Sequence, residues 1–151
     1  MSRTYYCEIN LHITWHCKDS LPMLTPQAEP LAHRYVKQKI INTPGAFLHE
    51  IGGTETHVHV AVSIPPTLTI SEFIGQLKGA SSHDVNQQLG LRGKVLQWQA
   101  GYGVVTFGSG DLEWVRQYIR SQREHHACGK VHERLERVTE PEPGEGRSGA
   151  P

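Results

Sequence analysis

The chain has 151 residues, and its 15 Lys and Arg residues balance 15 Asp and Glu residues to give a formal net charge of zero. This length suits one domain with a substantial core, and the neutral balance means that any binding to nucleic acid must come from local clusters of basic residues. No run approaches the roughly 20 apolar residues of a membrane span. The spacing of Cys7, Cys17 and Cys128 fits neither a disulfide framework nor a thiolate zinc site. We therefore expect a cytoplasmic protein with no membrane segment.

The first half of the chain predicts strand, helix and strand. Residues 5–16 alternate apolar and polar side chains, which is typical of a half-buried strand. Residues 31–41 carry an apolar stripe at helical spacing, and the following Asn-Thr-Pro-Gly sequence ends that helix. A short strand is expected at residues 46–51, and Gly52-Gly53 predicts the turn of a hairpin.

The strand expected after this turn contains two histidines. In residues 57–64 the valines and Ile64 recur at every second position, so His57 and His59 share the opposite side. Their backbone positions are about 6–7 Å apart, close enough for both imidazoles to bind one metal ion. Two solvent-facing histidines would give the same pattern, so both interpretations stay open at this point.

The second half predicts a helix, a strand and a last helix. The first helix starts near Thr69 or Ser71 and reaches Leu89, with an interruption by small residues at 78–82. A loop from residue 98 leads into a strand that ends near Phe107, and a helix follows from residue 111 to about residue 126. We expect residues 1–132 to form the domain and residues 133–151 to be a disordered acidic tail rich in Pro and Gly.

This order of elements is β-α-β-β-α-β with one more helix. It predicts an α+β fold of the ferredoxin-like, or RRM-like, split βαβ type. In such a fold two helices cover one face of a four-stranded antiparallel sheet. The last helix would then cover the other face, where the two histidines are expected.

The last predicted helix carries further candidates for chemistry. Tyr118, Gln122 and His126 are four residues apart and share one face of the helix. A tyrosine and an amide above two histidines would supply a nucleophile and a third metal ligand. The basic side chains on an adjoining stripe could contact phosphates, namely Arg116, Arg120 and Arg123. A core tyrosine and solvated arginines would fit the same spacing.

Four stretches carry a resemblance to a known family. His57-Val58-His59 resembles the His-hydrophobic-His signature of the HUH nucleases, and residues 118–122 resemble the tyrosine helix of the small single-tyrosine transposases. Residues 76–82 and 98–103 are similar to stretches of the same proteins. Over about residues 5–130 the chain therefore resembles the single-tyrosine transposases of the insertion-sequence-200-like type, which include the REP-associated tyrosine transposases.

The resemblance implies an activity and a set of roles. His57, His59 and Gln122 would hold a divalent cation, Mg²⁺ or Mn²⁺, and Tyr118 would be the nucleophile that forms a 5′-phosphotyrosine. The substrate would be single-stranded DNA folded into a hairpin, which is cut and rejoined by a homodimer. The expected DNA contacts combine basic side chains with aromatic rings for stacking, and the candidates are Lys78, Arg116, Arg120, Arg123, Trp98 and Tyr102. No general base for the tyrosine stands out.

Other functions share parts of this pattern. A HIT-type nucleotide hydrolase needs a third histidine where this chain has Ala61. A non-catalytic module for single-stranded nucleic acid would carry aromatic residues on the open sheet face, where histidines are expected here. A replication or relaxation initiator of the HUH type usually has a larger or additional domain. A protein whose candidate residues never meet is the remaining alternative.

Overall fold

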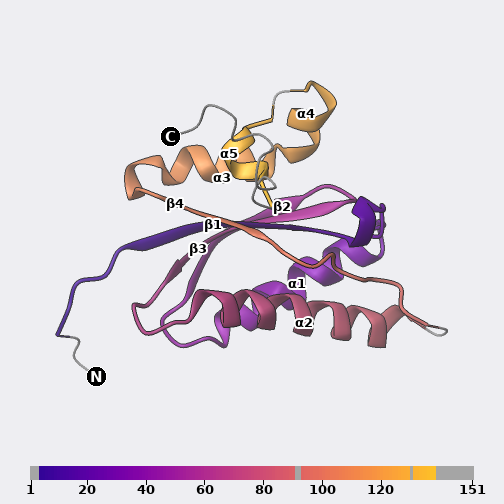
Figure 1. Ribbon diagram of the computed structural model, residues 1–151, viewed down its shortest axis with the longest axis horizontal. Coiled ribbons are helices and arrows are strands. Elements are labelled where there is room, and N and C mark those ends of the chain that lie inside the picture. The colour runs from indigo at the N-terminus through magenta and orange to yellow at the C-terminus, as the bar shows by residue number, and fades with distance from the viewer. Residues whose placement is uncertain (1–3, 91–92, 130, 139–151) are drawn as a thin grey trace, which may run out of the picture.

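Four strands form one antiparallel sheet in the computed structural model, which describes residues 4–90, 93–129 and 131–138. The strand order is β2-β3-β1-β4 (Figure 1). The strands are β1 (Ile9–His16), β2 (Phe47–Gly53), β3 (His57–Ile64) and β4 (Gly103–Phe107). Two helices alternate with them, α1 (Ala28–Ile41) and α2 (Ile70–Leu89). The predicted split βαβ fold is confirmed.

The main core lies between the sheet and the two helices. Leu11, Ile13 and Trp15 of β1 are almost fully buried there, as the alternation in the sequence predicted. Each such side chain contributes about 1.5–3 kcal/mol when it leaves water. Helix α1 begins at Ala28, three residues before the predicted start, because the hydroxyl of Thr25 accepts the Ala28 N–H at 3.1 Å.

Helix α2 is continuous, and the predicted interruption at residues 78–82 is wrong. The hydroxyls of Ser81 and Ser82 both donate to the Lys78 carbonyl at 3.1 Å, so they bond within the helix instead of ending it. Phe73 and Leu77 are buried against the sheet earlier in the same helix. Core packing on one face therefore outweighs the low helix propensity of the small residues.

A C-terminal layer covers the other face of the sheet (Figure 1). It consists of α3 (Leu112–Arg120), α4 (Gln122–Ala127) and α5 (Glu133–Glu136), and two 3₁₀ turns, Lys18–Ser20 and Ser109–Asp111, complete the secondary structure of the described residues. The single helix predicted from residue 111 to residue 126 is broken at Ser121, whose φ of −100° and ψ of 24° are not helical. None of the described helices has the length and apolar character needed to cross a membrane.

The folded part of the chain extends beyond the expected boundary after residue 132. Residues 133–136 form α5, and Leu135 is only 2% exposed. The predicted boundary between the domain and the disordered tail therefore lies too early in the chain. The remainder of that predicted tail, residues 139–151, lies outside the described residues.

The two glycines that predicted a hairpin turn lie inside β2, and the chain reverses at residues 54–56. A Cβ atom at Gly52 would lie 2.6 Å from the carbonyl oxygen of Ile119 in α3. Gly52 therefore allows the helix backbone to rest directly on the strand. This close approach fixes the height of α3 above the sheet.

Substituting Gly52 with alanine should force α3 away from β2. We expect the free energy of unfolding, measured by urea denaturation, to fall by about 1–3 kcal/mol. The new methyl group would meet the backbone carbonyl of Ile119, which cannot move aside as a flexible side chain can. The matched control is Gly75→Ala, since a Cβ at this position in α2 has nothing within 4 Å. That control should stabilise the protein by about 0.5–1 kcal/mol. A G52A variant as stable as the wild type would contradict this account of the α3 contact.

Candidate metal and nucleophile site

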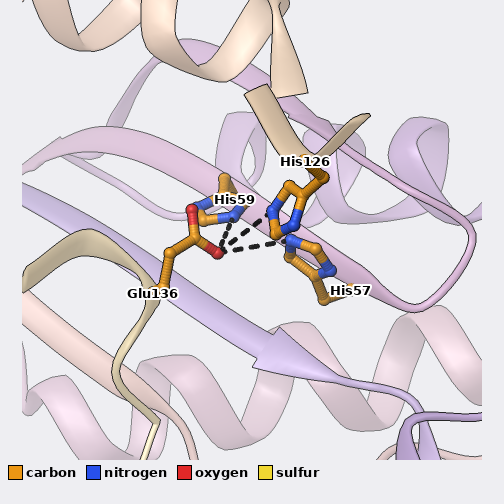
Figure 2. A group of neighbouring side chains, drawn as sticks. All are labelled: His57, His59, His126 and Glu136. Carbon is orange, nitrogen blue, oxygen red and sulfur yellow. Dashed lines mark ion pairs between the residues drawn. The ribbon is translucent and has the colours of Figure 1, made fainter. Parts of the chain in front are cut away.

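Three imidazoles surround one carboxylate on the sheet face beneath the C-terminal layer. Figure 2 shows His57 and His59 of β3 together with His126 of α4 and Glu136 of α5. The Oε1 atom of Glu136 lies 3.5 Å from Nε2 of His57, 3.2 Å from Nε2 of His59 and 3.4 Å from Nε2 of His126. Residues from the sheet and from two C-terminal helices thus converge on one point.

The two strand histidines are buried, which removes the interpretation that they face solvent. His57 is 2% exposed and His59 is fully buried. The hydroxyls of Thr54 and Thr56 each lie 3.0 Å from Nδ1 of His57, and Nε2 of His12 lies 2.9 Å from Nδ1 of His59. These partners fix both ring orientations, so that each Nε2 atom faces the cluster.

The surroundings of the Nε2 atom of His59 indicate whether the site fits a metal ion. It is buried without a hydrogen-bond partner among the described residues, although the Glu136 carboxylate is near. Burial lowers the pKa of His59, so its ring is neutral and Nε2 can keep a lone pair. In that tautomer Nδ1–H donates to His12. A buried lone pair of this kind, beside carboxylate and amide oxygens, fits a divalent cation.

Two further histidines lie behind the cluster on β1. Burial, followed by the neighbouring His59, lowers the pKa of His12 to about 3. Burial likewise lowers the pKa of His16 to about 4, and its ring stacks on that of His57 with centroids 4.9 Å apart. Both rings are therefore neutral at pH 7, so the protein holds uncharged imidazoles beneath the site.

These depressed pKa values predict loss of stability in acid. The unfolded chain binds a proton at His12 near pH 6.5, whereas the folded chain does so only near pH 3. The unfolded state therefore binds more protons between these values, and the stabilising contribution is complete above pH 6.5 and falls as the pH is lowered. From pH 6.5 to 5.5 His12 should remove about 1 kcal/mol from the free energy of unfolding. Urea denaturation of wild type and His12→Gln at several pH values measures this contribution. If the free energy of unfolding changed equally with pH in both proteins, the prediction would be contradicted.

Tyr118 of α3 lies in the same site and in the same chain. Its ring is 6.1 Å from that of His59 and is stacked between Trp114 at 5.5 Å and His125 at 4.8 Å. The hydroxyl donates to Oε2 of Glu136 at 2.5 Å and accepts the N–H of His132 at 2.7 Å. Burial, with the hydrogen bond to Glu136, raises the pKa of Tyr118 to about 12. In this arrangement the phenol keeps its proton.

Gln122, at the start of α4, points its carbonyl oxygen at the same cluster. Its Oε1 atom lies 3.3 Å from Nε2 of His57 and 3.1 Å from Nε2 of His126. Its side-chain nitrogen donates to the carbonyl of Tyr118 at 3.2 Å, which orients the amide. The structure therefore brings together the four residues that the sequence singled out for chemistry, His57, His59, Tyr118 and Gln122.

The basic residues expected to contact DNA are engaged within the protein. Arg120 donates to Glu50 at 3.1 Å, and Arg116 lies 3.6 Å from the same carboxylate. Arg123 of α4 pairs with Glu29 of α1 at 3.0 Å. The three guanidinium groups are 35–61% exposed, whereas the side chains of Glu50 and Glu29 are only 19% and 16% exposed, so these ion pairs are half-buried.

Lys78 and the two expected stacking rings hold the loop before β4. The Lys78 ammonium donates to the carbonyls of Gln99 and Gly101 at 2.8 Å each. Trp98 packs edge-on against Trp15, and Tyr102 is packed at the border of the main core. An exposed aromatic ring that stacks on Tyr118 is instead that of Trp114, which is 52% exposed.

Sequence reasoning missed the roles of His126, Glu136, His12 and Trp114 in building the site. For His126 the helical spacing after Gln122 was a usable signal. Glu136 had none, because it lies in an acidic stretch that resembles a solvated tail. Its position depends on Leu135, whose burial draws α5 onto the sheet.

Comparisons with known proteins agree on one family. The family model described as "Transposase IS200 like" matches residues 5–122. The chain is 29% identical over 130 residues to proteins named "Transposase for insertion sequence element IS200" from Salmonella typhimurium and from Salmonella typhi, and each alignment covers 79% of this chain and 85% of the relative.

Two solved structures share the fold. A Deinococcus radiodurans R1 protein assigned as a transposase superposes with a TM-score of 0.57 at 21% identity, over 81% of this chain and 96% of that one. A REP-associated tyrosine transposase bound to a REP hairpin superposes with a TM-score of 0.59 at 14% identity, over 87% of this chain and 74% of that one. The sheet and its helices are therefore an arrangement seen in transposase structures.

Proposed function

Since this chain belongs to the IS200-like transposase family, we propose that it is a metal-dependent enzyme that cuts and rejoins single-stranded DNA containing a hairpin. The observation that carries this proposal is the Tyr118 hydroxyl beside the buried imidazoles of His57 and His59. A phenol next to side chains that can bind a metal ion provides a nucleophile and a site for the cation, which together suit covalent phosphoryl transfer. The family assignment alone gives a DNA-transposition enzyme; the single-strand mechanism is our proposal.

Tyr118 acts as the nucleophile. Its oxygen forms a bond to the scissile phosphorus while the bond from phosphorus to the 3′ oxygen of the adjoining nucleotide breaks. The phenol loses its proton and the leaving 3′ oxygen gains one, so the products are a 5′-phosphotyrosine and a strand with a free 3′-hydroxyl. The phosphodiester energy is kept for rejoining. Stacking between Trp114 and His125 holds the ring in place for this attack.

His57, His59 and Gln122 would hold the divalent cation, Mg²⁺ or Mn²⁺. Two imidazoles and one amide oxygen leave coordination positions for phosphate oxygens. When bound, the cation polarises the scissile phosphate and offsets the charge that develops during displacement. Thr54, Thr56 and His12 keep the two imidazoles oriented toward it.

A hairpin in single-stranded DNA is the proposed substrate, and a homodimer is the proposed assembly. The REP-associated neighbour is described as bound to a REP hairpin, and we extend this class of ligand to the present chain. Arg116 and Arg120 would exchange the Glu50 carboxylate for backbone phosphates when DNA binds. The cytoplasmic location expected from the cysteines is consistent with this substrate.

The proposal is tested by locating the covalent bond. Labelled hairpin DNA with single-stranded flanks, incubated with the protein and Mn²⁺, should give an adduct that survives denaturing electrophoresis. Mass spectrometry of the digested adduct should place the nucleotide on Tyr118. Tight binding without an adduct would favour a non-catalytic DNA-binding module, and an adduct on another residue would contradict the assigned nucleophile.

A further inference from the structure

The C-terminal layer adds two potential ligands to the site, His126 and Glu136, beyond those expected from the sequence (Figure 2). We infer that both bind the metal ion, and that with His57, His59 and Gln122 they fill most of its coordination shell in a resting state. Glu136 then holds the position that a substrate phosphate oxygen takes during reaction. This last clause rests on the proposed function, whereas the ligand assignment is independent of it.

The distances at Glu136 are those of a coordination shell. Its Oε1 atom is 3.2–3.5 Å from three imidazole nitrogens, whereas an N–H···O hydrogen bond is most often about 2.9–3.0 Å long. Adjacent ligands bound at about 2.0–2.2 Å around one ion are separated by roughly 3 Å in octahedral geometry and by roughly 3.4 Å in tetrahedral geometry. The three separations from Oε1 are therefore close to those of ligands that share an ion, and all four ligand atoms lie within 4.8 Å of one another.

Gln122 adds a fifth donor to the same point. Its Oε1 atom is 3.1 Å and 3.3 Å from the Nε2 atoms of His126 and His57. Five protein donors would fill all but one position of a six-coordinate ion. Three imidazoles among the five donors disfavour Mg²⁺, which prefers oxygen ligands and keeps several waters.

The same carboxylate also restrains the nucleophile. Oε1 of Glu136 faces the three imidazoles, while Oε2 accepts the hydrogen bond of Tyr118 at 2.5 Å. Departure of this carboxylate would therefore free a position for the phosphate and release the phenol from its hydrogen bond. Helix α5 is a single turn. It is held in place by the buried Leu135 and by a hydrogen bond that the Arg134 side chain donates to the Thr106 carbonyl. Such a short element can detach without unfolding the sheet.

Metal affinity without DNA tests the ligand assignment. Titration with Mn²⁺, followed by the electron paramagnetic resonance signal of the free ion, should show Glu136→Gln binding at least about tenfold more weakly than wild type, since even outer partners of a metal site change affinity by 10–100-fold. Glu133→Gln is the matched control, because Glu133 is an exposed carboxylate of the same helix that pairs with Arg137. His126→Asn should weaken binding similarly, whereas the exposed His83→Asn should not.

Two readouts separate a ligand from a residue that only supports the fold. In the Co²⁺-substituted protein the visible absorption bands should change in Glu136→Gln, because they report on the atoms bound to cobalt. Amide hydrogen exchange at residues 131–137 should slow when Mn²⁺ is added to wild type and stay unchanged in the variant. Circular dichroism of the metal-free proteins checks that both are folded.

Adduct formation at saturating Mn²⁺ tests the resting state. Glu136→Gln should react severalfold faster with hairpin DNA than wild type, because the phosphate position and the phenol are released. Unchanged metal affinity in this variant overturns the ligand assignment, and slower reaction at saturating metal overturns the resting state. If neither wild type nor Glu136→Gln forms an adduct while Glu136→Gln loses metal affinity, the proposed DNA cleavage fails and the ligand assignment stands.

Discussion

Replacing Tyr118 with phenylalanine is expected to abolish covalent attachment to DNA and to reduce strand cleavage by at least about a thousandfold, as the loss of other enzymatic nucleophiles does. The ring should stay in its stack between Trp114 and His125, so the change removes the hydroxyl with its hydrogen bonds and leaves the ring in place. The measurement is single-turnover cleavage of labelled hairpin DNA with Mn²⁺. Cleavage by the variant at the wild-type rate would contradict the nucleophilic role.

The same substitution has a smaller effect on stability that must be separated from its effect on cleavage. Tyr118→Phe loses the hydrogen bonds to Glu136 and to the His132 N–H, which together should cost about 1–3 kcal/mol. Urea denaturation measures this loss, and cleavage is then compared at a temperature where both proteins are folded. Tyr35→Phe, in α1, is the control for removal of a tyrosine hydroxyl away from the site.

Replacing His57 with alanine is expected to eliminate metal-dependent cleavage. The variant should bind Mn²⁺ at least about tenfold more weakly, because loss of a direct ligand costs no less than loss of an outer partner. The side chain is buried and lies within hydrogen-bond distance of two threonine hydroxyls. Stability should therefore fall as well, by about 1–3 kcal/mol.

The control for this variant is the exposed histidine of α2, changed as His83→Ala. Its metal affinity and cleavage rate should equal those of wild type. Cleavage by His57→Ala that persists at saturating Mn²⁺ would remove His57 from the metal site. Loss of cleavage with unchanged metal affinity would assign it a different role.

Much of the fold was predictable because the spacing of apolar residues along the sequence indicates directly which side chains are buried. The alternation in β1 and β3 told which side chains enter the main core, and this placed His57 and His59 on the second face. The spacing of Tyr118 and Gln122 in the last helix then predicted that they would meet those histidines. Local patterns sufficed because each of these elements is long enough to show its period.

What could not be predicted depends on contacts between distant segments. Gly52 resembles a turn residue locally, yet its role is set by Ile119 of α3. Arg120 and Arg123 resemble free phosphate-binding residues, but their partners, Glu50 and Glu29, are 70 and 94 residues away in the sequence. Glu136 resembles part of a solvated tail until the buried Leu135 is seen beside it. A single sequence offers no local signal for such pairings.

The two faces of the sheet are stabilised very unequally. The face toward α1 and α2 shares the large hydrophobic core, whereas the face that carries the site is joined to α3 through a small cluster of three buried side chains, Ala61, Val115 and Ile119. Regions with few buried apolar contacts open at a lower free energy than the rest of the protein. Heating should therefore inactivate the enzyme before its sheet melts, so that a melting temperature overestimates the range in which it works.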